Sequence, residues 1–296
     1  MNVKAILACL LWGSAFAGAK IAFQYVDPIF LSGLRFTLAG MLLMPFIFLY
    51  KLDLRNALKH WRFMLLFAFV QTFLQYGLFF MGLSRVPAAT SSIIIGAGPL
   101  FVAIMAHVVL KNDKMTLRKL ISIALGMAGI VFISLTKGKL SDNDPVFYQG
   151  VALLVLSNII GSFTNIMVVQ KKEAKINPVV LTSFANFSGG LLLLATAFVV
   201  EKPELKQQPT EFYVALLWLS FISAAAFSLW YTELQKPGVK VSELNLWKFF
   251  VPVSGSILSW ILVTNEQPDV SSVVGILAIS IALLLPYFQK RSNFVH

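Results

Sequence analysis

The chain has 296 residues and a formal net charge of +11, with 58% hydrophobic residues, 12% charged residues and a mean hydropathy of +0.80. Soluble domains are about one quarter charged. A chain of this length cannot bury so much apolar surface in one aqueous core, so lipid must be its solvent. The single cysteine, Cys9, excludes a disulfide framework and a thiolate metal site.

A helix needs about 20 predominantly apolar residues to cross a bilayer. The hydropathy pattern predicts ten such spans: Val3–Tyr25, Ile29–Tyr50, Trp61–Leu83, Pro87–Leu110, Leu117–Leu135, Phe147–Val169, Pro178–Val200, Glu211–Glu233, Val241–Val263 and Val270–Phe288. The breaks carry turn signals such as Asp27-Pro28, Asn177-Pro178 and Lys236-Pro237-Gly238. We therefore expect an all-α integral membrane protein with ten transmembrane helices.

The first span also has features of a signal peptide, because Ala15-Phe16-Ala17 resembles a cleavage site. We favour a retained first helix, since the apolar run continues past that site. Cleavage would also destroy the internal repeat described below.

The positions of Lys and Arg predict the orientation. With the N-terminus in the cytoplasm, 16 of the 24 basic residues fall on the cytoplasmic side. Five fall outside (Arg85, Lys137, Lys139, Lys202 and Lys206), and three lie within spans (Lys20, Arg35 and Lys248). This bias predicts cytoplasmic termini and a location in the cell (plasma or inner) membrane. It also explains the net positive charge by topology, so we expect no nucleic-acid partner.

The sequence contains an internal repeat. Pro99 and Pro252 are 153 residues apart, as are Asp113 and Glu266, while Gly40 and Gly190 are 150 apart. The pattern predicts a first five-helix repeat at 1–136, a linker at 137–146, a second repeat at 147–290 and a cytoplasmic tail at 291–296. Because five is odd, the second repeat must enter the membrane inverted, as is common in secondary transporters.

The motifs resemble the EamA-type family of the drug/metabolite transporter superfamily. The resemblance covers nearly the whole chain: Leu11 to Phe16 (Leu-Trp-Gly-Ser-Ala-Phe), Pro28 with Arg35-Phe36, Leu83 to Ala89, Pro99, Leu110 to Thr116, Leu120 to Gly129, Trp230, Pro252 and Asn265-Glu266. One departure is Asn112-Asp113, where the family usually has Gly-Glu. The inverted repeat predicts alternating access, and the resemblance implies a cavity formed by the first four spans of each repeat. The fifth and tenth spans, which are richest in plain aliphatic and small residues, should be peripheral.

The resemblance further suggests export of amino acids or related metabolites. Uptake or antiport of organic anions, phosphorylated sugars or nucleotide sugars is the alternative. We expect a small-molecule substrate, no cofactor, and a monomer or homodimer in the lipid bilayer. An enzyme or a structural membrane subunit is less favoured, because the sequence has no Walker-type nucleotide loop, no paired catalytic carboxylates within spans and no clustered metal ligands.

Polar side chains within spans are costly in lipid and are therefore candidates for function. Lys248 is the leading one. It belongs to a helical stripe with Asn245, Pro252, Ser256 and Ser259 and has no acid at i±3 or i±4. It either binds an anionic substrate or extends its ammonium to the cytoplasmic interface.

The other candidates divide into two groups. The substrate-binding candidates, besides Lys248, are Trp12, Gln71, Gln75, Tyr76, Pro99, Asn158, Asn165 and Pro252; helix packing is the alternative for the amides and the tyrosine. The structural or gating candidates are Lys20, Arg35, Asn186 and Asn245, while Trp230 and Tyr231 are interpreted as an interfacial aromatic belt. Since the deep charges are all basic, we expect a ligand with a carboxylate or another anionic group.

Overall fold

A computed structural model describes residues 2–110, 113–140 and 144–288, without the side chains of 138–140, 283 and 285–288. Lys111, Asn112, residues 141–143 of the predicted linker and the predicted tail at 291–296 lie outside the described residues. Within them the chain folds into α1 (Val3–Ala22), α2 (Pro28–Leu49), α3 (Leu54–Lys59), α4 (Trp61–Phe67), η1 (Ala68–Gln75), α5 (Tyr76–Arg85), α6 (Ala88–Gly96), α7 (Gly98–Val109), α8 (Leu117–Leu140), α9 (Pro145–Gln170), η2 (Lys172–Ala174), α10 (Pro178–Val200), α11 (Thr210–Leu234), α12 (Val241–Asn245), η3 (Leu246–Phe249), α13 (Phe250–Leu262) and α14 (Val270–Phe288).

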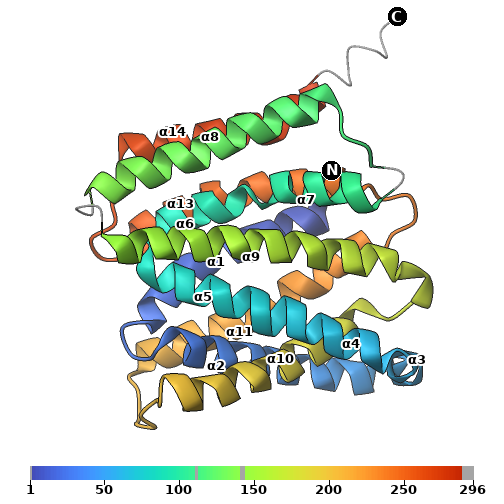
Figure 1. Cartoon of the computed structure of the whole chain (residues 1–296). Helices are drawn as coiled ribbons and strands as arrows, with labels where there is room; N and C mark the ends of the chain where they lie inside the picture. The colour runs from blue at the N-terminus through green and yellow to red at the C-terminus, as the bar shows by residue number, and fades with distance from the viewer. Residues whose placement is uncertain (1, 111–112, 141–143, 289–296) are drawn as a thin grey trace, which may run out of the picture.

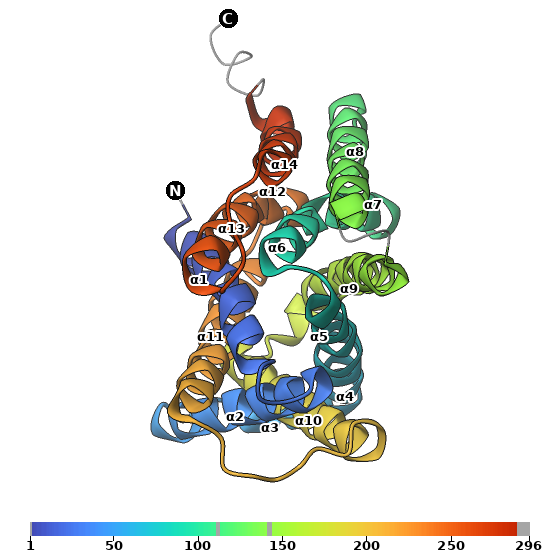
Figure 2. The same ribbon diagram turned by 90° about the vertical axis from the view of Figure 1, so that its left-hand side faces the viewer.

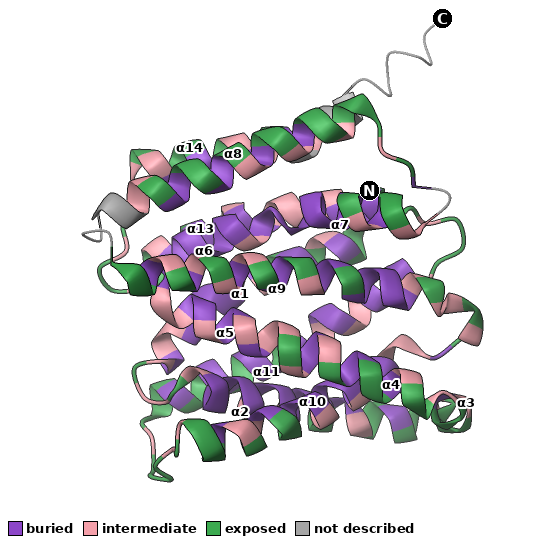
Figure 3. Ribbon diagram, viewed as in Figure 1, coloured by how far each residue is buried: buried purple, intermediate pink, exposed green. Residues whose placement is uncertain are grey.

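Eight helical segments of the described chain are long and apolar enough to cross a membrane, and they correspond to the first eight predicted spans. The predicted ninth span is divided into α12, η3 and α13, and the tenth corresponds to α14, which is apolar over Val270–Ala282. Large apolar side chains such as those of Phe48, Val199 and Ile261 are exposed. Exposed residues recur along the helices of the bundle (Figure 3). A surface of this kind is suited to hydrocarbon, and the protein is a multi-pass, all-helical membrane protein.

Three of the predicted spans are interrupted. The third contains a π-helix at Ala68–Gln75, the fourth breaks at Ala97, and the ninth contains a 3₁₀ segment at Leu246–Phe249. The break at Ala97 precedes Pro99, which lacks the backbone N–H needed to continue the helical ladder. Such interruptions are frequent where a helix lines a functional site.

The 3₁₀ segment interrupts the helix that carries the predicted stripe from Asn245 to Ser259. A 3₁₀ turn holds three residues, so the helix faces before and after it no longer coincide. Asn245 is buried, with its side-chain amide donating to the Val241 carbonyl at 2.9 Å, and Ser256 packs against Ser92 at 3.1 Å. Lys248, within the segment, is only partly buried, unlike Asn245 and Ser256.

The helices form a layered bundle. In Figure 1 and Figure 2, α8 and α14 lie side by side at one end, while α2 and α10 pack together at the opposite end. Between them α1, α5, α6, α9, α11 and α13 surround the centre (Figure 2). The fifth and tenth predicted spans therefore lie at the periphery.

The contact between α2 and α10 depends on glycines that are matched in sequence. A Cβ on Gly40 would lie 2.6 Å from the backbone nitrogen of Phe187, and one on Gly190 would lie 2.4 Å from that of Thr37. The offset of 150 residues that relates Gly40 to Gly190 also relates Thr37 to Phe187. Each contact is thus repeated with its partners exchanged, as at an interface with two-fold symmetry.

The N-terminal ends of two helices, α6 and α12, are also matched by the repeat. Glu266 accepts the backbone N–H groups of Ala88 and Ala89 at the start of α6, at 2.6 and 2.9 Å. Asp113 accepts the backbone N–H and the hydroxyl of Ser242 in α12, at 3.0 and 2.6 Å. An offset of 153 converts Ala89 to Ser242 and Asp113 to Glu266, so each carboxylate caps a helix from the other half of the chain.

Candidate functional site

A cavity of about 90 Å³ lies at the centre of the bundle. Residues of α1, α2, α5, α6, α7, α9, α11 and α13, together with η1 and η3, line it, whereas none of its described lining residues comes from α8 or α14. Its volume is below the roughly 300–1,000 Å³ typical of drug-sized ligands, so this conformation suits a small solute.

Aromatic rings form one wall of the cavity. Trp12 of α1 packs against Phe227 and Trp230 of α11, with ring centroids 5.4 and 5.3 Å apart. Tyr76 lies 5.6 Å from Phe227 on another side. Aromatic faces of this kind hold apolar groups and cations, and they give the cavity a fixed shape.

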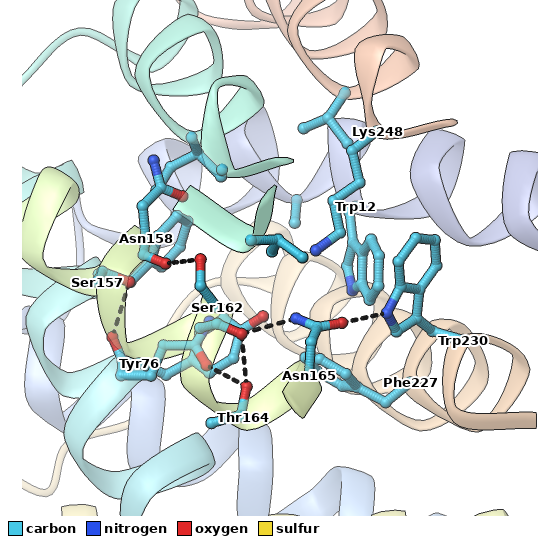
Figure 4. A pocket seen from close by; sticks show the side chains of 18 of the residues that line it. Trp12, Tyr76, Ser157, Asn158, Ser162, Thr164, Asn165, Phe227, Trp230 and Lys248 are labelled. Carbon is cyan, nitrogen blue, oxygen red and sulfur yellow. Dashed lines mark hydrogen bonds between the residues drawn. The ribbon is translucent and has the colours of Figure 1, made fainter. Parts of the chain in front are cut away.

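A polar face of α9 forms the opposing wall (Figure 4). Asn165 donates to the Gly161 carbonyl at 2.7 Å and accepts the indole N–H of Trp230 at 2.9 Å. Asn158 donates to the Ile94 carbonyl at 2.8 Å, at the end of α6 next to the break at Ala97. These bonds fix the orientation of both amides and tie α9 to the elements across the cavity.

Lys248 brings a cation to this cavity (Figure 4). Its Nζ lies 4.8 Å from the ring centroid of Trp230 and 5.6 Å from that of Trp12. No residue in the described part of the chain forms a hydrogen bond or an ion pair with this ammonium. The two rings stabilise the charge partly, and its three N–H donors remain available for an anionic ligand.

Arg35 is a second cation in the lining, but it is more fully enclosed. Its side chain is 1% exposed, and Nε donates to the Ser223 hydroxyl at 2.7 Å. Its guanidinium also lies 5.0 Å from the ring of Phe36 and 5.3 Å from that of Phe80. Nη1 of Arg35 has no hydrogen-bond partner within the described structure.

The cavity collects most of the substrate-binding candidates. Those in its lining are Trp12, Gln75, Tyr76, Asn158, Asn165 and Lys248, joined by Arg35 from the structural group. Those outside it are Gln71, Pro99, Pro252, Lys20, Asn186 and Asn245.

The residues outside have other roles. Gln71 is buried and accepts the Thr72 hydroxyl at 2.7 Å, and Pro252 packs where a Cβ on Gly96 would lie, 2.6 Å from its ring. Asn186 is buried next to α11 and donates to the Ser223 carbonyl at 3.4 Å. Lys20 extends its ammonium to the Ser84 carbonyl at 3.4 Å.

The interpretation of Trp230 and Tyr231 as an interfacial belt is wrong. Trp230 is 1% exposed and Tyr231 is 3% exposed, and both line the cavity with Phe227. The spacing of Phe227, Trp230 and Tyr231 places them on one face of α11, which is the signal that could have identified them. Their distance from the end of the apolar run does not reveal that face. Ser157 and Thr164 also line the cavity, and the sequence did not identify them as candidates.

Within the described residues, no group of three or more His, Cys, Asp or Glu side chains could hold a metal ion, and no Asp or Glu lines the cavity. The arrangement is a rigid aromatic and amide frame around an ammonium that has no carboxylate partner there. Such a site can bind a small amphipathic anion by direct contact.

Comparison with known proteins identifies the family. The model of the EamA-like transporter family matches twice, over residues 2–135 and 149–288. The chain is 22% identical to the uncharacterized transporter YoaV of Bacillus subtilis over 96% of this chain and 95% of that one. It is 26% identical to an uncharacterized transporter of Archaeoglobus fulgidus over 91% of each, and 26% identical to a chloroplastic WAT1-related protein of Arabidopsis thaliana over 95% of this chain and 68% of that one.

A solved crystal structure has the same fold, with a TM-score of 0.75 and 17% identity over 99% of this chain and 98% of that one. The family matches confirm the resemblance stated from the sequence motifs. This chain belongs to the EamA-like transporter family and is a membrane transporter.

Proposed function

We propose that this transporter works by alternating access and exports amino acids or related small metabolites that carry a carboxylate. The observation that supports the substrate class is the Lys248 ammonium, which faces the cavity between Trp12 and Trp230 without a carboxylate partner in the described chain. A deep cation is costly in a membrane protein. A bound anion would relieve that cost and gain charge-assisted hydrogen bonds.

The rest of the cavity suits an amino acid. With the carboxylate at Lys248, the substrate's apolar side chain packs against Trp12, Phe227 and Trp230. Side-chain oxygens in the lining, among them those of Gln75 and Asn165, can accept hydrogen bonds from its amino group. The volume of about 90 Å³ favours this size over a nucleotide sugar in the conformation seen.

Alternating access requires two halves that exchange roles, and we propose ten spans in two inverted repeats at 1–136 and 147–290. The reciprocal contacts Gly40–Phe187 and Gly190–Thr37 support this arrangement, as do the exchanged caps made by Asp113 and Glu266. The double match to the family model supports the same division. We place both termini in the cytoplasm of a cell-membrane protein from the positive-charge bias.

The second candidate function is uptake or antiport of organic anions or phosphorylated sugars. Arg35 favours it, because a second cation in the lining with a free Nη1 suits a substrate with two negative charges. This role requires the aromatic wall to move, since Arg35 is enclosed by Phe36 and Phe80 in the present conformation.

The test is counterflow of radiolabelled amino acids, organic acids and sugar phosphates in proteoliposomes. Wild-type, Lys248→Met, Lys248→Arg and Lys172→Met proteins are compared, the last being a control lysine in the connection between α9 and α10. Lys248→Met should lower kcat/KM for the carboxylate substrate at least about 30-fold, as loss of a buried charge partner costs about 2 kcal/mol or more. Lys248→Arg should retain part of the activity, and Lys172→Met all of it.

Unchanged kinetics in Lys248→Met would refute the anion-binding role of Lys248. Flux of sugar phosphates but not of amino acids would favour the second candidate. Absence of counterflow for every solute in the wild-type protein, with intact folding, would count against the proposed exchange mechanism.

A further inference from the structure

A second and larger cavity, of about 500 Å³, lies between α7, α8, α12 and α14, and we name it the α7–α8 cavity. Its described lining residues share no member with those of the central cavity. Nothing in the proposed transport cycle uses this space. It lies where the peripheral α8 and α14 pair meets the rest of the bundle (Figure 2).

The α7–α8 cavity is apolar along one wall and basic at its rim. Pro99, Leu100 and Ala103 of α7 and Ala282 of α14 are buried in its wall. The rim contains four basic side chains, Lys114, Arg118, Lys119 and Lys240, and two acidic ones, Asp113 and Glu243. Its formal charge is therefore positive.

Internal ion pairs leave two of these basic residues available. Lys119 pairs with Asp113 at 2.5 Å, and Lys240 pairs with Glu243 at 3.4 Å. Lys114 and Arg118 are exposed, and neither side chain has a hydrogen-bond or ion-pair partner within the described structure. The free positive charge of the rim is therefore concentrated at these two side chains.

The dimensions match one leaflet of a bilayer. From Pro99 to the end of α7 at Val109 the helix rises about 15 Å. This is about half of the 30 Å hydrocarbon core. The cavity thus runs from mid-span to the membrane surface, with apolar groups at the deep end and cations at the shallow end.

We propose that the α7–α8 cavity binds an anionic phospholipid. Its phosphate is held by Lys114 and Arg118, and one acyl chain lies against Pro99, Leu100 and Ala103. Phosphate is the anion whose geometry suits an arginine fork next to a lysine, and basic pockets between transmembrane helices are suited to such head groups. The apolar wall distinguishes a lipid from free phosphate, because inorganic phosphate leaves that wall uncovered.

The location gives the bound lipid a role in stability. Asp113, which caps α12, and Lys119, which pairs with it, both line the rim. A lipid there would bridge α7 and α8 and hold this end of α12 in place. Binding to the folded protein alone raises its apparent stability by mass action.

The experiment measures lipid binding to the purified, full-length protein by native mass spectrometry and by thermal unfolding in detergent. The probes are a phosphatidylglycerol and a phosphatidylcholine with identical acyl chains, with inorganic phosphate as a separate arm. The test variant is Lys114→Gln/Arg118→Gln. The control is Arg55→Gln/Lys59→Gln, which removes one arginine and one lysine at the same spacing from exposed positions in α3.

Wild-type and control proteins should retain phosphatidylglycerol in preference to phosphatidylcholine and gain thermal stability from it. Lys114→Gln/Arg118→Gln should bind phosphatidylglycerol about 30-fold more weakly, since each basic residue near the surface contributes about 1 kcal/mol. Millimolar inorganic phosphate should not displace the lipid. A further variant, Ala103→Phe, fills the apolar wall and should weaken both lipids, with central-cavity transport as its folding control.

Equal retention of the two lipids by the wild-type protein would overturn the proposal. Equal losses in the test and control variants would also overturn it, by indicating only general surface charge. Displacement by inorganic phosphate would assign the rim to a free anion instead. These outcomes are distinguishable from failure of the proposed transport function, because none of the readouts except the Ala103→Phe control depends on flux.

Discussion

Charged side chains in the central cavity and at the helix ends differ in whether the protein provides them with partners. In the cavity, Lys248 and Arg35 have no carboxylate partner in the described lining and are held by aromatic faces and one hydroxyl. At the helix ends, Asp113 and Glu266 each accept two or more hydrogen bonds, and Asp113 also pairs with Lys119. The described chain thus provides these two acids with its own donors, whereas it leaves the Lys248 ammonium available for another molecule.

This contrast separates structural charges from functional ones. A carboxylate at a helix N-terminus stabilises donors that the helix itself cannot satisfy. A cation in a cavity without an acid adds cost until a ligand arrives. Substitutions at the two kinds of position should therefore affect stability and transport differently.

The largest expected effect is a difference in stability between substitutions of the two cavity cations, Arg35 and Lys248. Arg35→Ala should destabilise the protein by about 3 kcal/mol, because it leaves a void between Phe36 and Phe80. Lys248→Met should leave stability unchanged or raise it, since an apolar group replaces an unpaired charge. Thermal unfolding of the two variants and of the wild-type protein in detergent measures both changes in stability. A strong loss of stability in Lys248→Met would show that Lys248 also has a structural role.

The two carboxylate caps should differ from each other. Asp113→Asn should cost about 2 kcal/mol, because it weakens the caps to Ser242 and removes the ion pair with Lys119. Glu266→Gln should cost about 1 kcal/mol, since the amide oxygen can still accept one N–H of α6. Urea or thermal unfolding of both variants tests the order. If Glu266→Gln proves the more costly, the ion pair with Lys119 contributes little.

A neutral pair in the cavity should show a smaller effect. Trp230→Phe removes the indole N–H that Asn165 accepts at 2.9 Å, and Asn165→Leu removes the acceptor. Each should cost about 1 kcal/mol, and the double variant should cost less than the sum of the two. A double-mutant cycle in unfolding free energy and in KM measures the coupling. Fully additive effects would indicate that this bond does not hold the frame.

The smallest expected effect is a loss of stability at acid pH that comes from the carboxylates at helix ends. Burial raises the pKa of Asp113, but hydrogen bonds from Lys119 and Ser242 outweigh it and hold the pKa below its usual range. Hydrogen bonds from Lys137, Ser271 and Ser272 likewise outweigh burial and hold the pKa of Asp269 well below its usual range.

A carboxylate with a depressed pKa in the folded state stabilises the protein fully above the unfolded pKa, and this contribution is lost as pH falls through the folded pKa. The contribution of these two carboxylates to stability should therefore be constant above about pH 4 and decline below it. Thermal scans between pH 7 and pH 3 measure it. In Asp113→Asn this decline should be smaller, and an equal decline would exclude Asp113 as its source.

Several parts of the fold could be predicted from the sequence because they depend on local composition. Bilayer thickness requires long apolar runs, so the spans are visible as runs and their ends as Pro, Asn and charge signals. Pro178 starts α10 as expected, with Asn177 accepting the Val179 N–H at 2.9 Å, and α2 starts at Pro28, one residue before the predicted start. The family resemblance and the candidates Trp12, Asn165 and Lys248 also came from the sequence.

The tertiary structure alone decided which polar residues meet. A helical pattern places residues on a face but does not say what that face contacts, and the π and 3₁₀ interruptions at Ala68–Gln75 and Leu246–Phe249 rotate the faces that follow them. Only packing therefore showed that Trp230 lies in the cavity and that Pro252 lies against Gly96. In the same way, Asp113 and Ser242 are far apart along the chain, and a hydrogen bond between them exists only because the two halves fold against each other.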